Sequence, residues 1–146
     1  EKPFTINSEI KVKESWIENA GKNNLVTIGK VLGKQTSLHQ EVDRTNPIVL
    51  SYPKKNINHI NLNIPTGYNI KSVANLVFNK EIKNSKNEVI GLFKSNAKVE
   101  GNVVKIEVEE LYNFTYLEKE KYNEYRDLIN ALYDFNNASL LLTRIN

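Results

Sequence analysis

The stretch Val99–Glu109, VEGNVVKIEVE, decides the fold class of this chain. A Gly-Asn pair at 101–102 separates residues that favour strands, and a two-residue loop of this composition is a recognised β-hairpin signal. After the loop, Val104, Ile106 and Val108 alternate with charged residues, so one face of the strand is apolar and the other is solvated. The sequence therefore predicts an antiparallel hairpin with a half-buried second strand.

The same alternation continues towards the amino end of the chain. It predicts strands around residues 6–12, 26–32, 48–52, 60–64, 69–82 and 88–94. A turn is expected at 53–56, Pro-Lys-Lys-Asn. A second turn is expected at 64–67, Ile-Pro-Thr-Gly, because proline suits its first corner and glycine its exit. We interpret this second turn as a structural corner rather than a binding loop.

Beyond residue 117 the apolar spacing changes to that of a helix. Apolar and amide residues recur every three or four positions, at Tyr122, Tyr125, Ile129, Leu132, Tyr133 and Asn136. The Asn136–Asn137 pair is a helix stop, and residues 139–145 read as a buried last strand. The sequence thus predicts one mainly β domain over residues 1–146, an antiparallel β-sandwich with one amphipathic helix near the C-terminus followed by a final strand.

Composition excludes several classes of function. The net charge is only +3, and the lysines are scattered instead of clustered, so nucleic-acid binding is not expected. The absence of cysteine excludes a disulfide framework, a thiolate metal site and a cysteine nucleophile. No apolar run approaches the roughly 18 residues that span a bilayer, so we expect no membrane insertion by this segment. Because the chain has no methionine, we expect it to be a processed form or an excised domain.

No catalytic, metal or cofactor site is predicted. His39 and His59 are the only histidines, and even with Asp43 they fall short of a typical three- or four-ligand site. Glu107 and Glu109 share one strand face and could serve as the paired acids of a glycosidase. Their alternation with the apolar residues Val104, Ile106 and Val108 favours a solvated face instead.

Aromatic residues give a different candidate. Five of them lie in or beside predicted strands: Trp16, Tyr52, Tyr68, Tyr112 and Tyr116. Exposed rings on a β-sandwich can stack on sugars or anchor a protein partner. The alternative is that these rings are core or cross-strand partners.

The order of several short motifs resembles one bacterial family over roughly residues 40–146. The motifs are Arg44-x-x-Pro47, Ile-Pro65-x-Gly67-Tyr68-x-Ile70, Val99-Glu-Gly-Asn-x-Val104, Tyr122-x-x-Tyr125-Arg126, and Asn137 with Leu140-Leu141-Leu142. The family is the β-rich domain of unknown function that follows a transglutaminase-like core in large exported bacterial proteins. In such proteins the Cys-His-Asp site belongs to the core, and this chain contains none of it.

The resemblance implies structural roles for the matched residues. Pro65, Gly67 and Tyr68 would form a strand-end corner, Arg44 and Pro47 the start of a strand, and Tyr122 with Arg126 the start of the closing helix. Residues 1–40 would be either the first strands of the domain or the connection from the core.

The implied function is that of a non-catalytic accessory domain. Its partner would be the transglutaminase-like domain of the same polypeptide, in a periplasmic or cell-surface protein whose signal segment lies outside this chain. Two alternatives remain, a carbohydrate- or protein-binding module that uses exposed aromatics, and a glycosidase-like enzyme with two acids.

Overall fold

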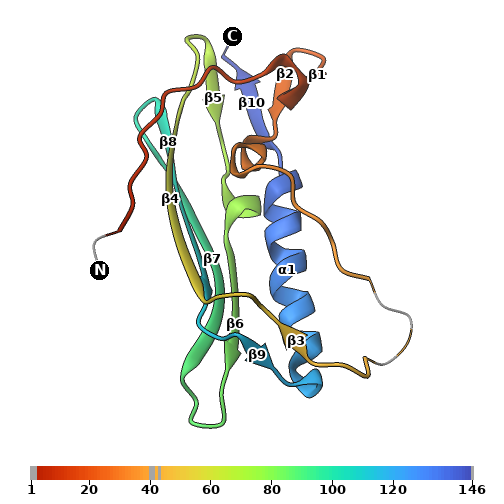
Figure 1. Ribbon diagram of the computed structural model, residues 1–146. Coiled ribbons are helices and arrows are strands. Elements are labelled where there is room, and N and C mark those ends of the chain that lie inside the picture. The colour runs from red at the N-terminus through yellow and green to blue at the C-terminus, as the bar shows by residue number, and fades with distance from the viewer. Residues whose placement is uncertain (1–2, 40–41, 43, 146) are drawn as a thin grey trace.

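The computed structural model describes residues 3–39, 42 and 44–145, in which three antiparallel sheets accompany one α-helix (Figure 1). The long sheet has the order β4 (Lys54–Asn63), β8 (Val103–Tyr112), β7 (Val89–Glu100), β6 (Phe78–Lys83). A smaller sheet has the order β1 (Ile17–Ala20), β2 (Asn23–Val26), β10 (Leu140–Arg144), β5 (Tyr68–Ile70). β3 (Ile48–Val49) pairs with β9 (Tyr116–Leu117). The helix α1 spans Tyr122–Asn137, and the 3-10 helices are η1 (Glu14–Trp16), η2 (Ile28–Leu32), η3 (Ala74–Leu76) and η4 (Lys119–Lys121).

The predicted hairpin forms the centre of the long sheet. β7 and β8 pair up to Glu100 and Val103, which leaves the two-residue loop Gly101–Asn102 between them. Gly101 has a φ of +60°, which glycine adopts at little cost at the first loop position. The alternating residues of β8 divide as expected, because Val104, Ile106 and Val108 are buried.

The helix packs against β6 and β7 on one face of the long sheet (Figure 1). Phe135 lies edge-on to Phe93 and Phe78, with ring centroids 6.0 and 6.3 Å away. After the helix, β10 runs between β2 and β5 and completes the smaller sheet at that end of the helix. The predicted fold is confirmed: mainly β, with antiparallel sheets in a sandwich-like arrangement, one late helix and a final strand.

The segment before β3 covers another side of the helix. η2 approaches α1 so closely that a Cβ on Gly29 would lie 2.3 Å from the carbonyl oxygen of Phe135, so only glycine fits there. Further along, the backbone N–H of Leu38 donates to Oδ1 of Asn130 over 2.7 Å, and Nδ2 of Asn130 donates back to the Leu38 carbonyl over 3.1 Å. The polar stretch of residues 33–39 is therefore held along the helix.

Several predicted strand positions were wrong. Residues 3–13 contain no strand, because their alternating apolar residues have no neighbouring strand with which to pair. The strand expected at 26–32 ends at Val26, and η2 then turns Ile28 towards the core. No turn occupies 53–56, since β4 starts at Lys54 opposite Tyr112. The strand expected at 69–82 is two strands, β5 and β6, with η3 between them.

The corner near Pro65 is real but lies one residue later than expected. The N–H of Tyr68 donates to the Pro65 carbonyl over 3.1 Å, so Thr66 and Gly67 occupy the two corner positions. Gly67 has a φ of +85°, the value that the second corner of a type II turn needs. The N–H of Ile145 donates to the Gly67 carbonyl over 2.8 Å, so the corner also anchors the end of the chain after β10.

Candidate functional site

Four of the motif residues meet where β3 and α1 begin. The guanidinium carbon of Arg44 lies 5.0 Å from the ring centroid of Tyr122, and that of Arg126 lies 6.0 Å from the same centroid. Arg44 also donates through Nε to the Asn46 carbonyl over 2.7 Å and through Nη2 to the Pro47 carbonyl over 3.3 Å. These contacts tie the chain before β3 to the first turn of the helix. We call Arg44 and Arg126 the arginine pair.

The other three motif residues form the corner before β5. Besides closing the turn with Pro65, Tyr68 accepts a hydrogen bond at its hydroxyl from Nδ2 of Asn24 over 3.2 Å. The corner lies at the opposite end of the molecule from β3 and the start of α1 (Figure 1). The motif residues thus form two clusters, one at each end.

The aromatic candidates do not form one platform. Tyr112 is 3% exposed and belongs to the core, so it offers no ring to a ligand. Trp16 is half-buried, and the ammonium group of Lys13 lies 5.8 Å from its ring centroid. Tyr68 is also half-buried. Tyr52 and Tyr116 remain as exposed rings, at 68% and 61%.

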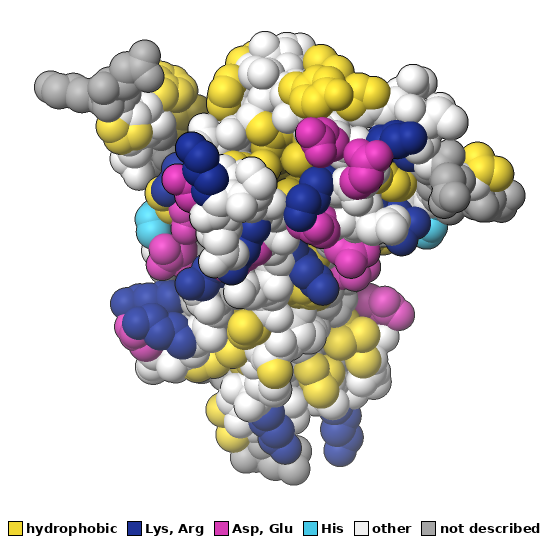
Figure 2. All heavy atoms as spheres, turned by 90° about the horizontal axis from the view of Figure 1, so that it is seen from below, with side chains coloured by type: hydrophobic (Ala, Val, Ile, Leu, Met, Phe, Trp, Pro, Cys, Tyr) yellow, Lys and Arg dark blue, Asp and Glu magenta, His cyan; other side chains and the backbone are white. Residues whose placement is uncertain are grey.

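Tyr116 has an exposed apolar neighbour across the strand pair. It is the partner of Val49, and residues opposite each other in an antiparallel pair point to the same side. Val49 is 70% exposed, whereas the next pair, Ile48 and Leu117, is buried. We call Val49 and Tyr116 the β3–β9 face. Figure 2 views the molecule from this end, where hydrophobic side chains form separate patches among charged ones.

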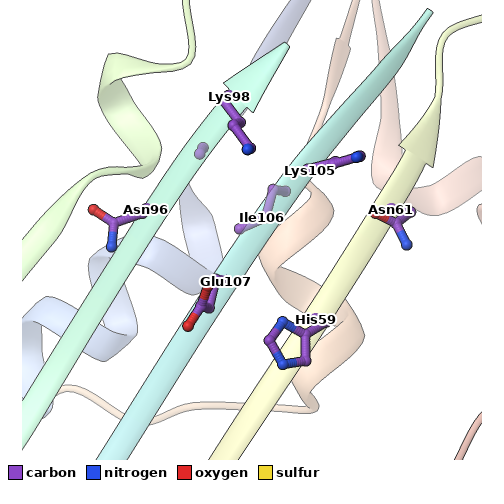
Figure 3. Close-up of a pocket in the computed structure, with 8 residues that line it drawn as sticks. His59, Asn61, Asn96, Lys98, Lys105, Ile106 and Glu107 are labelled. Atoms are coloured by element: carbon purple, nitrogen blue, oxygen red, sulfur yellow. The ribbon is translucent and has the colours of Figure 1, made fainter. Parts of the chain in front are cut away.

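A second surface lies on the face of the long sheet that points away from α1. A shallow concavity of about 320 Å³ there is lined by residues of β4, β7 and β8 (Figure 3). Its polar side chains are those of His59, Asn61, Asn96, Lys98, Lys105 and Glu107. His59 and Glu107 are cross-strand partners, as are Glu107 and Asn96, so they form one row across three strands.

The charges beside this concavity are mostly neutralised within the sheet. Nζ of Lys98 and Nζ of Lys105 each lie 2.5 Å from a different carboxylate oxygen of Glu100. The hydrogen bond from Lys105, and then that from Lys98, lowers the pKa of Glu100 to about 2. Similarly, Nζ of Lys55 lies 2.7 Å from Oε1 of Glu109 on the same face. The expected solvated face of Glu107 and Glu109 thus carries ion pairs, and it offers a shallow polar surface.

The opposite face of the sheet carries a buried carboxyl that the sequence reasoning did not single out. Glu110 is 7% exposed and stands in the buried row of Val108 and Tyr112. Burial raises the pKa of Glu110, although the charge of Lys54 opposes the rise. Burial also raises the pKa of Tyr112, with a further contribution from Glu110, and the Lys54 ammonium lies 5.0 Å from the Tyr112 ring centroid. Glu110 lies two residues from both Val108 and Tyr112, so the alternation along β8 is the sequence signal that it faces inwards.

Neither a group of metal ligands nor a membrane-spanning helix is found in the part of the chain that the structure describes. Its His, Asp and Glu side chains nowhere gather in groups of three that could hold a metal ion. Nε2 of His39 lies 3.2 Å from the Ser37 hydroxyl, while Asp43 is outside the described residues. No helix in the same residues has the length and apolar character needed to cross a membrane.

Comparison with known proteins gives a family but no characterised relative. No curated protein matches the chain, and no solved structure matches it. The family model of DUF3858, a domain of unknown function, matches residues 24–142. This match covers the long sheet, α1, β5 and most of β2 and β10, whereas β1 lies before it. The chain therefore belongs to the DUF3858 family.

Proposed function

We propose that this chain is a non-catalytic accessory domain of an exported bacterial protein with a transglutaminase-like core. The observation that carries the proposal is that the motif residues make structural contacts within the domain. Arg44, Tyr122 and Arg126 hold the start of the helix against the chain before β3, and Gly67 holds the end of the chain. The residues that carry the resemblance thus hold segments of the fold together, as expected of a domain that supports another one.

The identity of the partner rests on the order of the motifs. In the family that this order resembles, the domain follows a core with a Cys-His-Asp site. This chain contains no cysteine, so any thiol chemistry of the parent protein belongs to the core. Export is part of the same proposal and rests on the same resemblance.

The test uses the parent polypeptide, with and without residues 1–146. We expect an upstream core that contains the Cys-His-Asp residues, and we expect its thermal unfolding temperature to fall when the domain is removed. The acyl-transfer activity of the core, measured well below that temperature, should persist, because its nucleophile lies in the core. A parent gene without such a core would overturn the proposal, and so would a core that unfolds at the same temperature in both forms.

A second candidate function is binding of a glycan or a protein through exposed rings. Tyr52 and Tyr116 favour it, since both are largely exposed and aromatic rings often carry such contacts. Binding of the chain to a panel of bacterial surface glycans tests the glycan form of this alternative. Glycan binding that is lost in Tyr52→Ala or Tyr116→Ala would favour the alternative over the accessory role.

A further inference from the structure

The arginine pair carries positive charge that no carboxylate among the described residues neutralises in an ion pair. Both guanidinium carbons lie within 6.0 Å of the Tyr122 ring centroid, so they are at most 11 Å apart. Both side chains are half-buried, which weakens their screening by water. In the described part of the chain neither arginine has a carboxylate within 4 Å. The nearby Glu124 is paired with Lys121 at 2.8 Å.

The two arginines are bound to the domain to different degrees. Arg44 is fixed by its bonds to the carbonyls of Asn46 and Pro47. Arg126, in contrast, makes no hydrogen bond to another residue that the structure describes, and its contact with Tyr122 is a cation–π contact, so its N–H groups are available to a partner. A guanidinium can bind a carboxylate through two parallel hydrogen bonds. Arg126 is therefore the residue best suited to receive an acidic group from outside.

An apolar surface accompanies this charge. Pro47, which accepts a bond from Arg44, directly precedes β3, and β9 leads through η4 into Tyr122. β3, β9 and the start of α1 lie at the same end of the molecule (Figure 1), so the β3–β9 face and the arginine pair are at that end. Val49 and Tyr116 are too exposed to contribute to the core and would gain from an apolar partner.

We propose that the arginine pair and the β3–β9 face form a docking surface for an acidic segment of polypeptide. The segment would present a carboxylate to Arg126 and an apolar side chain to Val49 and Tyr116. Two guanidiniums at the same end of the molecule as two exposed apolar side chains fit such a segment better than a polyanion, which needs a row of positive charges. We assign the segment to the preceding core of the same polypeptide, and this assignment rests on the proposed function.

The test introduces single charge changes into the parent polypeptide. Removal of the whole domain should lower the unfolding temperature of the core, and Arg126→Glu should cause at least half of that fall. The reason is that the substitution replaces attraction between Arg126 and the carboxylate of the segment by repulsion between two carboxylates. Arg126→Lys, which keeps the charge, should cause much less of the fall. Lys119→Glu is the matched control, since Lys119 is exposed in η4 at the same end and makes the same change in charge. Tyr116→Ala should act in the same direction as Arg126→Glu.

Two further measurements separate the possible outcomes. The unfolding temperature of residues 1–146 alone, with and without Arg126→Glu, measures how far the substitution destabilises the domain itself. Only a fall in the unfolding temperature of the core beyond that destabilisation supports the docking surface. Raising the salt concentration should reduce the difference between Arg126→Glu and the parent. If removal of the domain lowers the stability of the core but Arg126→Glu acts no more strongly than Lys119→Glu, this inference is overturned and the accessory role stands. If removal of the domain leaves the unfolding temperature of the core unchanged, the proposed accessory role is overturned, and so is the assignment of the docked segment to the core.

Discussion

Asn136 donates from its side-chain Nδ2 to the carbonyl oxygen of Gly29 over 2.9 Å, across most of the chain. The same nitrogen donates to the carbonyl of Gly33 over 2.8 Å. One amide group near the end of α1 therefore holds both ends of η2, and Asn136 itself is buried. The bonds join the amino-terminal part of the family match to its helix.

Replacement of Asn136 by alanine should destabilise the domain by about 1–3 kcal/mol, because two carbonyls then lose their donor and one of them is buried. Denaturant unfolding of the chain measures this change. The neighbouring Asn137→Ala is the control, since among the described residues the exposed amide of Asn137 donates only to the carbonyl of Tyr133 within the helix. Equal effects of the two substitutions would contradict the structural role of Asn136.

Gly67→Val should lower the free energy of unfolding by about 1–2 kcal/mol, the cost of a left-handed backbone for a residue with a side chain. The φ of +85° is the only obstacle, because a Cβ at this position meets no atom within 4 Å. Thr66→Val, at the other exposed corner of the same turn, should cost less than about 0.5 kcal/mol. Thermal unfolding of both variants checks the difference, and an unchanged melting temperature for Gly67→Val would refute the turn.

How far the fold could be predicted depended on whether each strand had neighbours. β8 lies between β4 and β7, and its alternation gave the correct inward and outward faces. Residues 6–12 alternate equally well, yet Ile6 and Ile10 are exposed and no strand forms. Alternation shows which side chains could share one face of a strand. Whether the strand forms depends on another strand being available to pair with it, and that depends on the tertiary structure.

The candidate site was predictable in its residues but not in its geometry. The motif order singled out Arg44, Tyr122 and Arg126, whereas their convergence depends on how β3 and β9 bring distant segments together. The inward position of Glu110 could have been predicted from the sequence, because alternate residues of a strand point to the same side and Glu110 is two residues from Val108. The long-range hydrogen bonds of Asn136 could not be predicted, because an asparagine near the end of a helical pattern normally indicates only where the helix stops.

Removal of residues 1–11 should change the stability of the chain by less than about 0.5 kcal/mol. Phe4, Ile6 and Ile10 are exposed, and no hydrogen bond ties the described residues of this segment to the rest. Removal of residues 1–26 is the contrasting deletion, because it also takes away β2, which pairs with β10. We expect the longer deletion to abolish cooperative thermal unfolding, and a large effect of the shorter one would mean that residues 3–11 pack against the domain.

Glu110→Gln should stabilise the chain at pH 7 and have little effect near pH 4. Burial raises the pKa of Glu110 in the folded state above its ordinary value of 4.5, so the folded chain holds this proton more tightly than the unfolded chain. The free energy of unfolding then falls as the pH rises from about the ordinary glutamate value through the raised one. Glutamine keeps the shape but has no proton to lose, and the cost of a buried charge disappears.

The charged groups around Glu110 set the size of this effect but not its sign. Lys54 attracts the carboxylate and loses that attraction in Glu110→Gln, yet burial is the larger influence on the pKa. Tyr112, the next inward residue of β8, is neutral at both pH values, because even the ordinary tyrosine pKa of 10.0 lies well above them and burial raises it further. Glu109→Gln is the matched control, because Glu109 points outwards and pairs with Lys55, and its effect should stay below about 1 kcal/mol at either pH. Denaturant unfolding at pH 4 and pH 7 compares the three proteins. If Glu110→Gln were less stable than the parent at pH 7, the carboxylate of Glu110 would be stabilising the fold, and burial would not be the dominant influence on its charge.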